Sequence, residues 1–97
     1  MTTFVSLINL TDQGVRDVKR SPHRFEAFKA MAARLGVKVK AVYYTVGQFD
    51  MIVIVEGNEQ SAIASLLATN ALGNIRSQTM LAYSVDEMKD IAAMMPG

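Results

Sequence analysis

Side chains that could perform chemistry are few in this sequence and are spread along it. His23 is the sole histidine, and histidine is the side chain that changes charge near neutral pH. It falls in the first turn of a predicted helix, roughly opposite Phe25, Phe28 and Ala32, so we expect it to be solvated. A single histidine and no cysteine also argue against a strong transition-metal site. We predict no catalytic residue, no metal and no cofactor, and keep His23 as a secondary candidate only.

Asp50 is a carboxylate at the start of an otherwise apolar predicted strand. It could anchor a ligand or a subunit interface, or it could accept hydrogen bonds from backbone N–H groups around the preceding turn. The structural and interface interpretations are favoured. Gln48 and Phe49 belong to the same candidate group but are expected to serve the turn and its packing.

Four further side chains on predicted strands could line a cavity between two packed sheets. Tyr43, Tyr44 and Arg76 offer hydroxyl and guanidinium groups that could hold a carboxylate or a phenol. Gln78 follows Arg76 at strand spacing. Cross-strand packing is the more common role of such residues, and it is favoured here.

Asp12 and Gln13 form a secondary candidate pair in the loop after the first predicted strand. Loops on rigid scaffolds often carry function, but an Asx turn explains the pair equally simply. The neighbouring Gly14 belongs to neither a dinucleotide nor a P-loop pattern, so no phosphate site is indicated.

The elements that position these residues alternate in the order β-α-β-β-α-β, followed by a last helix. Alternating apolar residues, helical spacing and turn residues delimit them. Ser21 and Pro22 are expected to cap and open the first long helix, and Gly47 and Gln48 to form a two-residue hairpin turn. Residues 15–20 make at most one helical turn. The expected strands are 3–10, 37–46, 49–56 and 75–83, and the expected helices are 21–35, 59–72 and 84–95.

This order predicts a single α+β domain over residues 1–97, of the ferredoxin-like kind with a four-stranded antiparallel sheet. The net charge of +1 gives no broad attraction to nucleic acid or anionic membranes. An RNA-binding role ranks third among the functions considered, because the central strand is aliphatic rather than aromatic. No secretory signal or membrane-spanning stretch is apparent, so the cytoplasm is the expected location.

Both faces of the sheet appear apolar in sequence. In the third strand Met51, Val53 and Val55 oppose Ile52 and Ile54, and strands that are apolar on both faces are usually buried on both. Two helices can cover only one face. We therefore predict that a second copy of the chain covers the other, in a homodimer or a larger homo-oligomer.

Residues 43–56 resemble the signature of the GYD domain family, which is named for a Gly-x-Tyr-Asp element. Here the element is Gly47-Gln48-Phe49-Asp50, so Phe49 replaces the usual tyrosine and its hydroxyl is missing. Further similarity lies in residues 10–14, 36–40 and 72–76. The resemblance implies a dimeric α/β-barrel with two sheets face to face, and it implies no biochemical role.

Residues 46–56 and 72–81 are more distantly similar to the effector-binding domain of leucine-responsive transcription regulators. That similarity implies a small-molecule ligand near subunit contacts, without DNA binding, because no helix-turn-helix precedes the first strand. We therefore favour a homo-oligomeric domain that binds a small molecule at or near its interface. The alternative is a small cofactor-independent oxygenase or isomerase, which fold analogy alone suggests.

Overall fold

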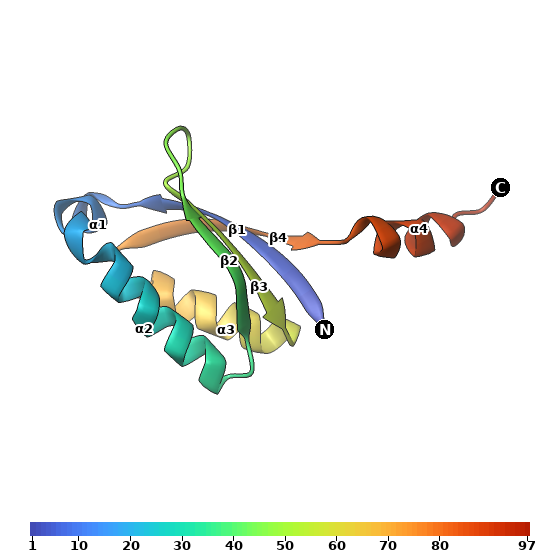
Figure 1. Ribbon diagram of the computed structural model, residues 1–97, viewed down its shortest axis with the longest axis horizontal. Helices are drawn as coiled ribbons and strands as arrows, with labels where there is room; N and C mark the ends of the chain where they lie inside the picture. The colour runs from blue at the N-terminus through green and yellow to red at the C-terminus, as the bar shows by residue number, and fades with distance from the viewer.

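The computed structural model describes all 97 residues, which form an α+β fold with a projecting C-terminal helix (Figure 1). The predicted fold class and element order are confirmed. The strands are β1 (Thr2–Leu10), β2 (Lys38–Tyr44), β3 (Met51–Gly57) and β4 (Ile75–Ala82). The helices are α1 (Asp12–Arg16), the 3₁₀ turn η1 (Val18–Arg20), α2 (Ser21–Arg34), α3 (Glu59–Asn70) and α4 (Val85–Ala93).

The four strands form one antiparallel sheet in the order β2-β3-β1-β4. β2 and β4 are therefore the two edges, and a register shift between Val39 and Ala41 interrupts the pairing of β2 with β3. Helices α2 and α3 lie together on one face of this sheet (Figure 1). The other face is covered by no element of the chain.

The core lies between the sheet and these two helices. Every second residue of β3 is buried, and the same alternation runs through the middle of β1. Side chains from α2 and α3 complete the core by packing on them. The buried apolar residues are Phe4, Ile8, Phe28, Ala32, Val37, Met51, Val53, Val55, Ala62 and Leu66.

The start of α2 differs from the prediction. Ser21 is not the cap but the first helical residue, and Pro22 is the second, because η1 delivers the chain in a helical conformation. The Ser21 hydroxyl is buried and lies 2.8 Å from the Tyr44 hydroxyl. It therefore ties the helix to the sheet rather than capping the helix.

The connection from β2 to β3 is also longer than predicted. Residues 45–50 form a six-residue loop instead of a two-residue hairpin at Gly47 and Gln48, and β3 begins only at Met51. Phe49 and Asp50 consequently lie in the loop, not in the strand. The two ends of the loop are joined by a hydrogen bond of 2.8 Å from the Thr45 N–H to the Asp50 carbonyl.

Helix α4 extends away from the domain in line with β4 (Figure 1). None of its residues is buried. The radius of gyration is 14.9 Å, compared with about 13 Å for a compact chain of this size. Met80 of β4 and Met88 of α4 are about half exposed. No helix has the length and apolar character needed to cross a membrane.

Candidate functional site

The uncovered face of the sheet carries apolar side chains from all four strands. Residues paired across an antiparallel sheet point to the same side, so the strand register identifies which side chains lie there. They alternate with the core residues along every strand. We call this surface the open face: Val5 and Leu7 of β1, Ala41 and Tyr43 of β2, Ile52 and Ile54 of β3, and Met80 and Gln78 of β4.

These residues form two rows across the sheet. One row runs Ala41, Ile54, Val5 and Met80, and the next runs Tyr43, Ile52, Leu7 and Gln78. The four central side chains and Ala41 are half-buried, whereas the other edge side chains are exposed, with Tyr43 at 65% and Met80 at 47%. Seven of the eight are apolar or aromatic, which is unusual for a sheet face in contact with water.

Polar residues border the open face at both ends. Asn9 and the exposed Arg76 form a pair at one end, and Lys38, Glu56 and Thr3 form the row at the other. An apolar centre with a polar rim is the usual composition of a protein–protein interface. The sequence showed that both faces were apolar but did not determine which face lacked a cover.

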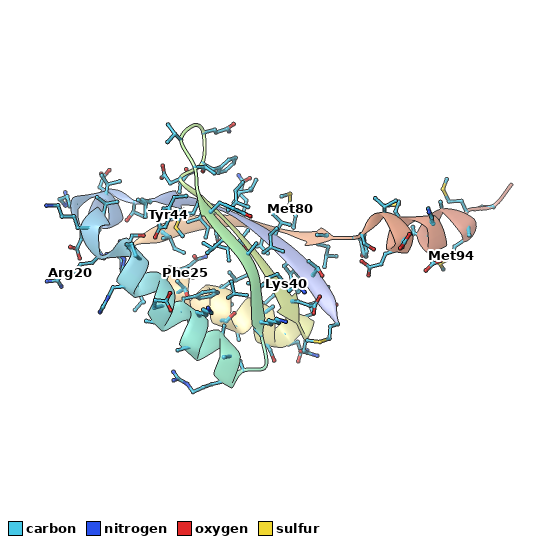
Figure 2. All side chains as sticks on the ribbon, viewed as in Figure 1. Arg20, Phe25, Lys40, Tyr44, Met80 and Met94 are labelled. Atoms are coloured by element: carbon cyan, nitrogen blue, oxygen red, sulfur yellow. The ribbon has the colours of Figure 1, made fainter.

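The two neighbouring tyrosines diverge. Tyr43 pairs with Ile52 and lies on the open face, whereas Tyr44 pairs with Met51 and lies on the helix side. The Tyr44 hydroxyl is held by Ser21 of α2, close to the end of β2 (Figure 2). Only Tyr43 is therefore available to line a cavity between two sheets, together with Gln78 in the same row and Arg76 at the margin.

Asp50 anchors the β2–β3 loop to β1. Its Oδ2 accepts a hydrogen bond of 2.8 Å from the Leu10 N–H, and its own N–H donates to the Ile8 carbonyl at 2.8 Å. The carboxylate thus accepts a backbone N–H, as one interpretation predicted, but from β1 and not from the turn. Gln48 is exposed and Phe49 is half-buried in the same loop.

Asp12 and Gln13 belong to α1 and do not form a site together. Gln13 donates through Nε2 to the Leu72 carbonyl at 3.1 Å and to Asn74 Oδ1 at 2.9 Å. Gln13 therefore fastens α1 to the α3–β4 connection. Asp12 is exposed in the first turn of α1, and Gly14 is buried so closely that a Cβ atom there would lie 2.1 Å from the Asn74 carbonyl oxygen.

The ion pairs of the molecule lie away from the open face: Asp17 pairs with Arg20 and Arg24, and Asp86 pairs with Lys89. His23 is exposed on α2, as predicted. Hydrogen bonds from the backbone N–H and the hydroxyl of Ser84 lower the pKa of Glu87, which lies on α4 far from the sheet. No three His, Cys, Asp or Glu residues gather closely enough to bind a metal. Charged side chains on the open-face side lie only at its margins.

A groove that the sequence did not predict lies on the helix side, between α2 and α3. Its volume is about 370 Å³, and most of the residues that line it are apolar, among them Phe25, Met31 and Leu72. Small residues at Ala27 and Ala68 leave this space between the helices. Alanines at facing helix positions are the only sequence signal that could have indicated it. The neighbouring Arg24 is already engaged by the Asp17 carbonyl at 2.9 Å.

Comparison with known proteins assigns this chain to a family. The sequence profile of the GYD domain matches residues 4–92, nearly the whole chain. A curated relative from Thermus thermophilus is named a glutamine synthetase and cystathionine beta-lyase binding protein. It is 29% identical over 90 residues, and the alignment covers 91% of this chain and 95% of the relative.

Solved structures share the fold. The crystal structure of FFRP-DM1 superposes with a TM-score of 0.56 at 24% identity, covering 86% of this chain and all of that one. A hypothetical protein, PHS023 from Pyrococcus horikoshii, also gives a TM-score of 0.56 at 24% identity, with 87% and 92% covered. At 24% identity these similarities support a shared fold and no shared function.

Proposed function

This chain belongs to the GYD domain family, and from that premise we propose that it is a self-associating protein-binding module. In this proposal two copies pack through their open faces, and the assembly binds other proteins. The observation that carries it is the open face itself, a sheet surface with an apolar centre and no cover within the chain. Cytoplasmic location stays a prediction.

The physical argument concerns the cost of leaving this surface in water. Val5, Leu7, Ile52 and Ile54 occupy its centre, and all are only half-buried. Full burial of an exposed side chain of this size is worth about 1.5–3 kcal/mol, so each of these half-buried side chains gains roughly half of that when the face is covered. Contiguous apolar patches on monomers rarely exceed a few hundred Å² unless they bind something. A second copy offers the same flat, apolar surface with the same polar rim, so it is a suitable cover.

A protein partner beyond the second copy is supported by the relative from Thermus thermophilus. That relative is named as a binding protein of two enzymes, and the similarity covers nearly all of both chains. We propose that this chain likewise binds enzymes. Such a role needs no convergent catalytic groups, and it uses an outer surface that remains free when the open faces are paired.

Two measurements test the proposal. Light scattering should give at least twice the mass of one 10.6 kDa chain at micromolar concentration. Biolayer interferometry should detect binding of purified glutamine synthetase or cystathionine beta-lyase from the same source, with bovine serum albumin as the control. A monomeric mass would refute self-association. Failure to bind either enzyme would refute the extension from the relative and leave self-association standing.

A second candidate is a small ligand enclosed between the two paired sheets. It is favoured by the position of Gln78, a polar side chain within an otherwise apolar row that also contains Tyr43. Arg76 lies at the margin nearby. An amide, a phenol and a guanidinium within an apolar enclosure could orient a small carboxylate or phenol. Native mass spectrometry of the assembly tests this directly, because a retained ligand would add mass, and Gln78→Leu should abolish the addition.

A further inference from the structure

The groove between α2 and α3 has the size and the lining of a ligand site. Its volume is about 370 Å³, and small-molecule pockets measure roughly 300–1,000 Å³. An apolar cavity of about 150 Å³ holds one benzene molecule, so this groove has room for roughly ten to fifteen carbon atoms. The sheet forms its floor through Ile8, Met51 and Val53, and the two helices form its walls.

The apolar walls of the groove are in contact with solvent. Phe25 and Met31 of α2 are half-buried, and Leu72 after α3 is 67% exposed. Figure 2 shows Phe25 near the start of α2. Ala27 and Ala68, one on each helix, are too small to close the space between the helices. An apolar molecule in the groove would cover these walls, and the burial of apolar surface favours binding.

The only charge in the lining of the groove is positive. Arg24 is its one charged residue, and no Asp or Glu is among the fifteen that line it. Nη2 of Arg24 lies 3.4 Å from the Gly14 carbonyl, and Gly14 packs tightly against Asn74. Asn74 also lines the groove. Arg24 and Asn74 therefore lie at the same end of it, one on α2 and the other on the α3–β4 connection.

Both of these side chains keep donors that the chain does not use. Nη1 of Arg24 donates to the Asp17 carbonyl at 2.9 Å, whereas its Nε–H has no acceptor in the chain. Asn74 accepts from Gln13 through Oδ1, and its Nδ2 has no acceptor. The Asp17 carboxylate lies 3.4 Å from Arg24 Nη1 but is 53% exposed, so it competes only weakly for this charge.

We propose that the groove binds an amphipathic carboxylate with an unbranched chain of roughly ten carbons. The chain lies between α2 and α3 against Phe25 and Met31, and the carboxylate accepts hydrogen bonds from Arg24 and Asn74. One guanidinium balances one negative charge and matches the geometry of a carboxylate, which favours this head group over a dianionic phosphate. The groove is on the helix side, so the inference is independent of self-association through the open face.

Methyl NMR of the methionines tests where such a ligand binds. Full-length protein labelled at the methionine methyl groups is titrated with decanoate and, separately, with decanol, which has the same chain and no charge. Met31 and Met51 line the groove, whereas Met80 lies on the open face. Decanoate should shift the signals of Met31 and Met51 and saturate them below about 1 mM. The absence of a saturable shift at these two residues would overturn the inference.

A substitution that fills the groove gives the second test. Ala27→Phe places a ring in the groove and should weaken decanoate binding about tenfold or more, and Ala68→Phe should do the same from α3. Ala33→Phe is the matched control, because Ala33 is also exposed on α2 but does not line the groove. It lies about 120° around the helix from Ala27. Equal affinities of the Ala27 and Ala33 variants for decanoate would place the ligand elsewhere and overturn the inference.

The head group is tested by two substitutions with opposite effects. Arg24→Gln should weaken decanoate binding about tenfold, because a hydrogen bond to a charged group is lost, and should leave decanol binding unchanged. Asp17→Asn removes the competing carboxylate and should strengthen decanoate binding about two- to fivefold. Circular dichroism checks that both variants stay folded. An equal effect of Arg24→Gln on both ligands, or weaker decanoate binding by Asp17→Asn, overturns the assignment of a carboxylate.

Discussion

Two adjacent residues of β3 should respond in opposite ways to the same substitution. Ile52 lies at the centre of the open face between Tyr43 and Leu7, whereas Val53 is 3% exposed and faces α2 and α3. Ile52→Lys should give a folded monomer. Val53→Lys should unfold the domain, because its ammonium group would lie in the core.

The magnitudes follow from these two environments. Ile52→Lys removes about 1 kcal/mol of apolar burial per copy, because Ile52 is already half-buried in the single chain, and it leaves an unpaired charge against an apolar surface, which costs roughly 2–4 kcal/mol more after relaxation. Each dimer contains the substitution twice. The total loss is roughly 6–10 kcal/mol, so Kd should rise by at least about four orders of magnitude. For Val53→Lys a similar cost per copy falls on a domain whose stability is about 5–15 kcal/mol.

Light scattering and far-UV circular dichroism measure the two outcomes together. Val46→Lys is the matched control, since Val46 is fully exposed in the β2–β3 loop and the variant should keep both the mass and the spectrum of the wild type. A folded Ile52→Lys variant that retains the wild-type dimer mass would refute the reasoning. So would a Val53→Lys variant that stays folded.

Three further predictions concern single residues that stabilise the sheet, the packing of α1 and the start of α4. Asp50→Ala should lower the free energy of unfolding by about 1–3 kcal/mol, measured by urea titration, because the Leu10 N–H loses its acceptor; Asp50→Asn keeps an acceptor and should lose less. Gly14→Ala should cost a similar 1–3 kcal/mol in the same assay, because its Cβ would overlap the Asn74 carbonyl oxygen and force the backbone apart; an unchanged midpoint would contradict this close packing. The lowered pKa of Glu87 predicts that the helical content of α4, followed by NMR chemical shifts, is highest above the ordinary carboxyl range and decreases as the pH falls from that range through the lowered pKa; Glu87→Gln, which keeps a hydrogen-bond acceptor but does not titrate, should reduce that pH dependence.

Most of the fold was accessible from the sequence because its elements have strong local patterns. The continuous apolar run in residues 51–55 and the helical spacing of Phe25, Phe28 and Ala32 each correspond to an element of the expected type. The boundaries at Ser21 and Gly47 were wrong for a physical reason. Both depend on contacts with distant residues, namely the Ser21–Tyr44 hydrogen bond and the attachment of the β2–β3 loop to β1, which local patterns do not contain.

The candidate site residues show the same limit: their types were predictable from the sequence, but their tertiary contacts were not. Residue types alone grouped Tyr43 with Tyr44, but successive strand residues point to opposite faces, and the sequence did not fix the face of either one. The structure assigns Tyr43 to the open face and Tyr44 to the helix layer. Likewise, Asp50 was identifiable as an exceptional carboxylate, whereas its bond to the Leu10 N–H depends on the tertiary approach of β1 and the β2–β3 loop.

Helix α4 shows most clearly what local sequence patterns cannot predict. Its capping box and its stripe of Val85, Met88 and Ile91 predict a helix that packs by one side. Periodicity says nothing of the surface on which that side packs, and the surface is absent from the chain itself. In the structure no residue of this stripe is buried. The pattern therefore identifies the helix and the side by which it can pack, because both are local properties, but it does not identify the neighbour.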